Sequence, residues 1–111
     1  FGPLVMFGLG GIYVEVLADV SFRLAPLTLA DAQEMIEEVR SAKLLAGLRG
    51  APPADRVALA DAIVRIGQLA ADHPEITELD INPLLVLSEG AGALAVDERI
   101  VLQVPDLTME G

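Results

Sequence analysis

The sequence predicts an α+β fold in which an antiparallel sheet carries two helices on one face. Glycine-punctuated, β-rich segments stand at both ends of the chain, and two segments with helical spacing of apolar residues stand between them. This segregation of strands from helices is typical of α+β domains. With 53% hydrophobic residues among 111, the chain can bury the core of one domain.

Composition excludes several classes of function. The absence of cysteine excludes disulfides, thiol catalysis and cysteine-based metal sites. The net charge of −10 repels phosphate backbones and argues against nucleic-acid binding. No apolar run approaches the roughly 18 residues of a membrane span, and no basic segment precedes an apolar one as in a signal peptide. We therefore expect a cytoplasmic protein.

The N-terminal part is predicted to form three strands. Leu4–Phe7 is a short apolar run before a glycine-rich turn, typical of a buried strand. Ile12–Leu17 alternates in character, so Glu15 points toward solvent or toward a site. Ser21–Ala25 is the third strand and carries Arg23.

Two helices follow. Thr28 is a favourable N-cap, with Asp31 near the positive end of the helix dipole, and this helix should end near Ser41. The second helix is predicted to start at Ala51–Pro53, because proline is tolerated in a first turn. It should stop before Pro74.

The C-terminal part returns to strands. Ile76–Leu87 is strand-like with an interruption at Pro83, Ser88–Gly92 is a turn, and Ala93–Leu102 closes the sheet as one strand or two.

One of these strands has an unusual polar row. Strand alternation places Glu78, Asp80 and Asn82 on one face, with Leu79 and Ile81 on the other. Aspartate and asparagine are poor strand formers, and the following proline removes a donor from the ladder. Several residues that are unfavourable in a strand, found together in one strand, suggest a functional site.

The register of the closing hairpin decides what faces this row. A hairpin that turns at Glu89–Gly90 places Asn82 opposite Asp97, and directly opposed Cβ atoms lie roughly 4.5–5.5 Å apart. Arg99 follows on the same face, within reach of a phosphate. A five-residue loop, or a bulge at Pro83, would shift this pairing by about one position.

An amide and a carboxylate suit a hard cation. Oxygen ligands favour Mg²⁺, Mn²⁺ or Ca²⁺ over zinc. Two protein ligands are too few for a calcium cage but are typical of Mg²⁺ that bridges nucleotide phosphates. The competing interpretation makes Asn82 and Asp97 turn or edge residues on a solvated face.

Four segments also occur in a familiar order: GGIYVEV at 10–16, SFRLAPL at 21–27, DINPL at 80–84 and VDERI at 96–100. Together they resemble the C-terminal part of the ATP-grasp domain of NDP-forming acyl-CoA synthetases, such as ADP-forming acetate–CoA ligase. A more distant similarity is to the β subunit of succinyl-CoA synthetase. The resemblance covers nearly all of residues 1–102, and we assign 103–111 to a tail.

The resemblance implies roles for individual residues. Asn82 and Asp97 would be Mg²⁺ ligands that hold ATP or ADP, Arg23 and Arg99 would face phosphate, and Glu15 would lie near the nucleotide cleft. Alternatively, Arg23 forms a surface ion pair and Glu15 is a solvated strand residue.

The resemblance also implies an activity and partners. Such enzymes interconvert acyl-CoA, ADP and phosphate with acid, CoA and ATP through a phosphohistidine on another domain. The single histidine, His73, stands at a helix end, so we expect no catalytic residue in this chain. The chain begins with Phe1 rather than methionine, which suggests part of a longer polypeptide. We expect the first half of the ATP-grasp domain and a CoA-binding domain or subunit as partners, and no activity from this chain alone.

Two other functions fit the same sequence. The domain could serve as a regulatory ATP-grasp module of a protein acyltransferase, because such modules also occur fused to acetyltransferases. It could instead be a non-enzymatic interaction module, which the excess of hydrophobic residues would suit.

Overall fold

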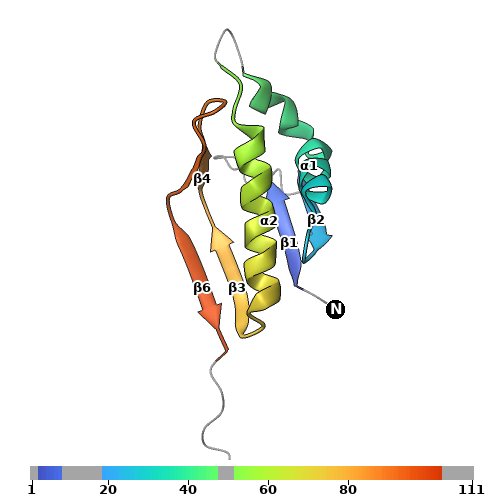
Figure 1. Ribbon diagram of the computed structural model, residues 1–111, viewed down its shortest axis with the longest axis vertical. Coiled ribbons are helices and arrows are strands. Elements are labelled where there is room, and N and C mark those ends of the chain that lie inside the picture. The colour runs from blue at the N-terminus through green and yellow to red at the C-terminus, as the bar shows by residue number, and fades with distance from the viewer. Residues whose placement is uncertain (1–2, 9–18, 48–51, 104–111) are drawn as a thin grey trace, which may run out of the picture.

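The computed structural model describes residues 3–8, 19–47 and 52–103 and confirms the α+β class. Two α-helices lie over one side of the strands (Figure 1). The elements in chain order are β1 Leu4–Gly8, β2 Val20–Leu24, α1 Leu29–Glu38, the 3-10 helix η1 Arg40–Ala46, α2 Arg56–Asp72, β3 Ile76–Ile81, β4 Leu84–Val86, β5 Ala93–Ala95 and β6 Glu98–Leu102.

The strands pair as three antiparallel ladders, β1–β2, β3–β6 and β4–β5. The described residues therefore do not form the single continuous sheet that we predicted. The β3–β6 and β4–β5 ladders follow one another along the same pair of chain segments, and the break falls at Asn82–Pro83 and Val96–Asp97. Proline has no N–H to donate, which explains an interruption at this point. The predicted strand Ile12–Leu17 lies outside the described residues.

Helix α1 begins where the sequence predicts. The Thr28 hydroxyl accepts a hydrogen bond from the Asp31 N–H at 3.1 Å, and the Asp31 carboxylate accepts one from the Thr28 N–H at 2.9 Å. This reciprocal capping box satisfies two N–H groups that the first turn leaves without helical partners. The helix ends at Glu38, slightly before the predicted Ser41, and η1 continues the chain as a 3-10 helix.

Helix α2 begins at Arg56, so the predicted start at Ala51–Pro53 is wrong. Asp55 is the N-cap, and its carboxylate accepts a hydrogen bond from the Ala58 N–H at 3.0 Å. The residues before it are held outside the helix, because the Ala54 N–H donates to the Leu45 carbonyl at 2.7 Å. The helix ends at Asp72, before Pro74, as predicted.

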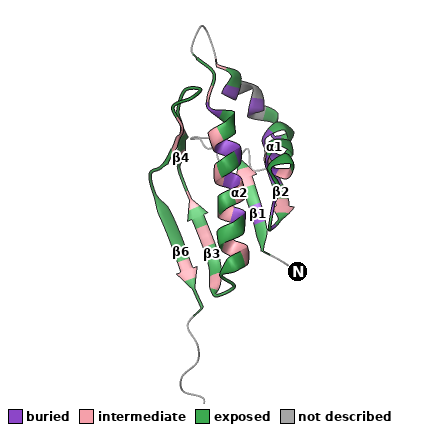
Figure 2. Cartoon of the chain, in the orientation of Figure 1, coloured by how far each residue is buried: buried purple, intermediate pink, exposed green. Residues whose placement is uncertain are grey.

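The core lies where α1, α2 and the inner face of β1–β2 meet (Figure 2). Met35 of α1 is completely buried at its centre. Helix α2 approaches closely through Gly67, where an added Cβ would lie 2.4 Å from Leu27 Cδ1 and 3.6 Å from Val5 Cγ2. The β3–β6 ladder, in contrast, is largely exposed (Figure 2). Within the described residues, no helix is long and apolar enough to cross a membrane.

The buried face of α1 should carry much of the stability. We expect Met35→Ala to lower the free energy of unfolding by about 2–5 kcal/mol, because the substitution leaves a cavity in a packed core. Leu29→Ala is the matched control, since Leu29 lies in the first turn of the same helix with 52% of its surface exposed. Urea unfolding of both variants tests the placement of the core, and losses of equal size would contradict it.

Candidate metal and phosphate site

The two C-terminal ladders bring Asn82 and Asp97 together. In β4–β5, Leu84 is opposite Ala95, and in β3–β6, Ile81 is opposite Glu98. These pairs flank Asn82 and Asp97 and keep one register across the break. The Asn82 N–H donates to the Asp97 carbonyl at 3.0 Å. The structure thus contains the predicted juxtaposition, while the role of the two residues as metal ligands stays a prediction.

The turn that sets this register is also the predicted one. The Ala91 N–H donates to the Ser88 carbonyl at 2.8 Å, and the Leu87 N–H donates to the Gly92 carbonyl at 2.9 Å. Gly90 and Gly92 have φ values of 86° and 92°, a backbone region that favours glycine. The pairing therefore needs neither a five-residue loop nor a shift at the proline.

The face that carries Asn82 is acidic and exposed. Glu78 and Asp80 are exposed on β3, whereas Leu79 and Ile81 are half-buried, as strand alternation predicts. Arg99 of β6 is opposite Asp80, and its guanidinium donates to the Glu78 carboxylate at 2.5 Å. An exposed ion pair is weak, so an incoming phosphate can compete with Glu78 for this guanidinium.

The donor set fits a cation that brings ligands of its own. Asn82 offers an amide oxygen and Asp97 a carboxylate, both on exposed residues. Among the described residues, no group of three or more His, Cys, Asp or Glu side chains could hold a metal ion. A site of two oxygen donors matches Mg²⁺ bound jointly by protein, nucleotide phosphates and water, rather than a cage made entirely of protein.

The structure places Arg23 elsewhere. Arg23 lies on β2, opposite Val5 of β1. Its guanidinium forms ion pairs with two glutamates of α1, Glu38 and, at 3.5 Å, Glu34. The hydrogen bond to Glu38 raises the pKa of Arg23 above its ordinary value. This is the surface ion pair of our alternative interpretation, and a phosphate-facing role stays a prediction. Glu15 lies outside the described residues.

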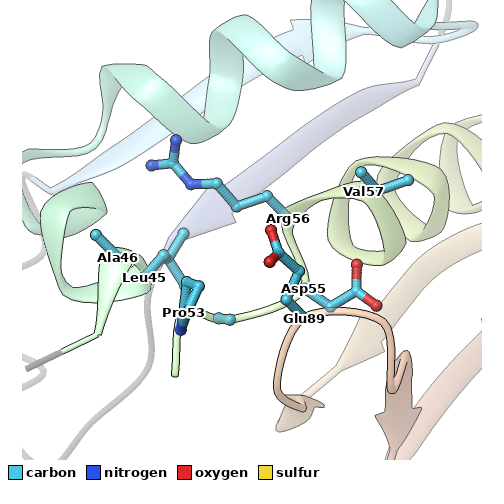
Figure 3. Close-up of a pocket in the computed structure, with 8 residues that line it drawn as sticks. Leu45, Ala46, Pro53, Asp55, Arg56, Val57 and Glu89 are labelled. Carbon is cyan, nitrogen blue, oxygen red and sulfur yellow. The ribbon is translucent and has the colours of Figure 1, made fainter. Parts of the chain in front are cut away.

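Sequence reasoning missed Asp55, a buried residue with 7% of its surface exposed. One oxygen caps α2, and the other accepts hydrogen bonds from the N–H groups of Gly90 at 3.1 Å and Gly92 at 2.9 Å. Figure 3 shows Asp55 between the first turn of α2 and the turn that carries Glu89. The N–H of Ala58, followed by that of Gly92, lowers the pKa of Asp55 below its usual range. An aspartate directly before a helical apolar pattern was the available signal.

A pocket beside Asp55 is not a convincing nucleotide site. It lies between η1, the start of α2 and the β4–β5 turn, at the opposite end of β4–β5 from Asn82 and Asp97 (Figure 3). Its volume of about 260 Å³ is below the roughly 300–1,000 Å³ of small-molecule sites. The Arg56 guanidinium, its cationic group, donates to the Ala42 carbonyl at 3.3 Å.

Comparison with known proteins decides the family. The family model for the ATP-grasp domain matches residues 1–102. The chain belongs to the ATP-grasp family. It is 56% identical over 102 residues to the β subunit of an ADP-forming acetate–CoA ligase I from Pyrococcus furiosus, covering 92% of this chain and 43% of that subunit. It is 53% identical over 102 residues to an ADP-forming acetate–CoA ligase I from Archaeoglobus fulgidus, covering 92% of this chain and 15% of the relative.

A solved relative supports the same fold. The dinucleotide-forming acetyl-CoA synthetase 1 of Candidatus Korarchaeum cryptofilum, in complex with coenzyme A and Mg-AMPPCP, superposes with a TM-score of 0.84 at 50% identity. The match covers 92% of this ATP-grasp chain and 47% of the chain in that structure. The chain thus spans less than half the length of each of these three relatives.

The hydrogen bonds of Asp55 should make the stability of the ATP-grasp chain depend on pH. Because the folded-state pKa is lowered, the stabilisation is fully present above the unfolded-state value of about 4 and is lost as pH falls through the folded-state value. We expect wild type to be more stable than Asp55→Asn at pH 7, with the difference shrinking in acid below about pH 4. Thermal unfolding of both proteins from pH 7 to pH 2.5 measures this, and a constant difference would contradict it.

Proposed function

We propose that this chain is the nucleotide- and Mg²⁺-binding portion of an NDP-forming acyl-CoA synthetase. The complete enzyme would interconvert acyl-CoA, ADP and phosphate with acid, CoA and ATP. The observation that carries the proposal is the hydrogen-bonded neighbourhood of Asn82 and Asp97 on an acidic face. The ADP-forming ligases among the relatives and the Mg-AMPPCP complex of the solved relative support it.

Each residue of the site would have a distinct task. The Asn82 amide oxygen and the Asp97 carboxylate would hold the metal from two neighbouring segments, so that the bound nucleotide takes one orientation. Bound Mg²⁺ would offset negative charge on the phosphoryl group that is transferred. Arg99 would leave Glu78 and donate to a phosphate oxygen. The chain would supply binding and electrostatics, while the phosphohistidine would come from another domain.

The outer face of β1–β2 has the character of a surface that contacts another part of the enzyme. Leu4 is directly opposite Leu24, and Met6 is directly opposite Phe22. All four side chains are exposed, Met6 to 63%. A row of exposed apolar pairs is typical of a surface that another part of the protein covers. Because the Pyrococcus β subunit is more than twice as long as the matched region, we propose that the remainder of the ligase packs here.

The metal pair can be tested in the complete ligase. We expect Asn82→Ala and Asp97→Ala each to weaken Mg·ADP binding by at least about tenfold, since even outer partners of metal ligands typically contribute that much. Asp61→Asn is the control, because it removes an exposed carboxylate from α2 instead. Titration calorimetry with Mg·ADP gives the dissociation constants. Unchanged binding in both site variants would refute the proposed function.

A further inference from the structure

We propose that Asp55 is a positioning residue for the Asn82–Asp97 pair. Its carboxylate ties the tip of the β4–β5 hairpin to the start of α2, and the hairpin in turn presents the pair at its other end. The inference rests on the proposed function, because it assigns Asp55 an effect on metal binding. It concerns a residue outside the acidic face itself.

The tip of the hairpin is attached to the start of α2. Besides accepting from Gly90 and Gly92, Asp55 donates its own N–H to the Leu87 carbonyl at 2.8 Å. The Glu89 N–H donates to the Pro53 carbonyl, also at 2.8 Å. Four hydrogen bonds therefore join the segment before α2 to the turn, and the carboxylate of Asp55, a buried residue, accepts two of them.

The β4–β5 ladder connects this tip to the Asn82–Asp97 pair. Strand β4 has three residues, a length of roughly 10 Å at 3.3 Å per residue. Leu84 and Val86 of this strand pack against the core. The ladder is thus a short spacer that is held by the core along its length and by Asp55 at its tip.

The position of the Asn82–Asp97 pair depends on this spacer. At the boundary between the ladders, the Pro83 carbonyl accepts a hydrogen bond from the Val96 N–H at 3.1 Å. Pro83 itself has no N–H to donate. On the far side, the β3–β6 ladder keeps its register next to the site, from Ile81–Glu98 to Leu79–Ile100, but it is largely exposed. The β4–β5 side is therefore the one that the core and Asp55 hold.

Asp55→Asn separates capping from anchoring. Asparagine is as good an N-cap as aspartate, so α2 should persist. The amide has one oxygen in place of two, however, and cannot accept from both Ala58 and the two glycines. Asp55→Ser is a second variant, since serine also caps helices but its single hydroxyl cannot serve both sets of N–H groups. Thr28→Ala is the control, because it removes the N-cap of α1, which lies outside the hairpin.

The experiment uses the complete ligase with Mn²⁺ and ADP as probes. Electron paramagnetic resonance of free Mn²⁺ gives the metal affinity, and hydrogen exchange of peptides covering residues 88–92 gives the protection of the turn. We expect Asp55→Asn to speed exchange in the turn and to weaken Mn²⁺ binding by roughly tenfold, with Thr28→Ala changing neither. Asp55→Ser should do the same if Asp55→Asn does not fold.

The outcomes separate the two proposals. Faster exchange in the turn with unchanged Mn²⁺ affinity would overturn the positioning role of Asp55. Unchanged exchange would overturn the attachment itself. If Asn82→Ala also leaves Mn²⁺ affinity unchanged in the same assay, the proposed function fails. If Asn82→Ala weakens binding and Asp55→Asn does not, only the present inference fails.

Discussion

A single antiparallel register, kept across the boundary between the β3–β6 and β4–β5 ladders, brings the two residues of the candidate site together. The pairing of Leu84 with Ala95 on one side and of Asp80 with Arg99 on the other leaves Asn82 next to Asp97. A slip of one residue in an antiparallel pair turns a side chain to the opposite face. Features that fix this register therefore matter to the site even where they are distant from it.

These features belong to the packed part of the molecule. The core between the helices and β1–β2 supports the start of α2, and Asp55 connects that start to the hairpin turn. The acidic face extends from this support into solvent. Such an arrangement leaves the polar groups of Asn82 and Asp97 accessible while the backbone that carries them is held from one side.

Charge favours a metal–nucleotide complex over a bare nucleotide as the ligand that we propose for the candidate site. The chain has a net charge of −10, and the face around Asn82 carries Glu78 and Asp80. A nucleotide polyphosphate would be repelled from this face unless a divalent cation bridged the two. Among the described residues, Arg99 lies beside these acidic side chains, and its guanidinium forms an ion pair with Glu78.

Local patterns in the sequence predicted much of this arrangement. The capping box at Thr28, the turn at Glu89–Gly90 and the alternation around Asp80 depend on neighbouring residues, so the sequence identifies them directly. The predicted start of α2 was wrong. The prolines before the helix suggested a first turn, whereas tertiary hydrogen bonds hold that segment outside the helix. Gly90 and Gly92, which donate to the Asp55 carboxylate, are more than 30 residues away from it. The partners of Arg23 likewise lie on a separate helix. No local pattern contains such contacts.

Joint binding of one metal ion by Asn82 and Asp97 is what we propose for this site. Anomalous diffraction from crystals of the complete protein with Mn²⁺ and ADP would locate that ion. We expect a manganese peak in contact with the Asn82 amide oxygen, the Asp97 carboxylate and a phosphate oxygen. A nucleotide-bound manganese ion held by other residues, with these two side chains turned away from it, would refute joint binding by Asn82 and Asp97.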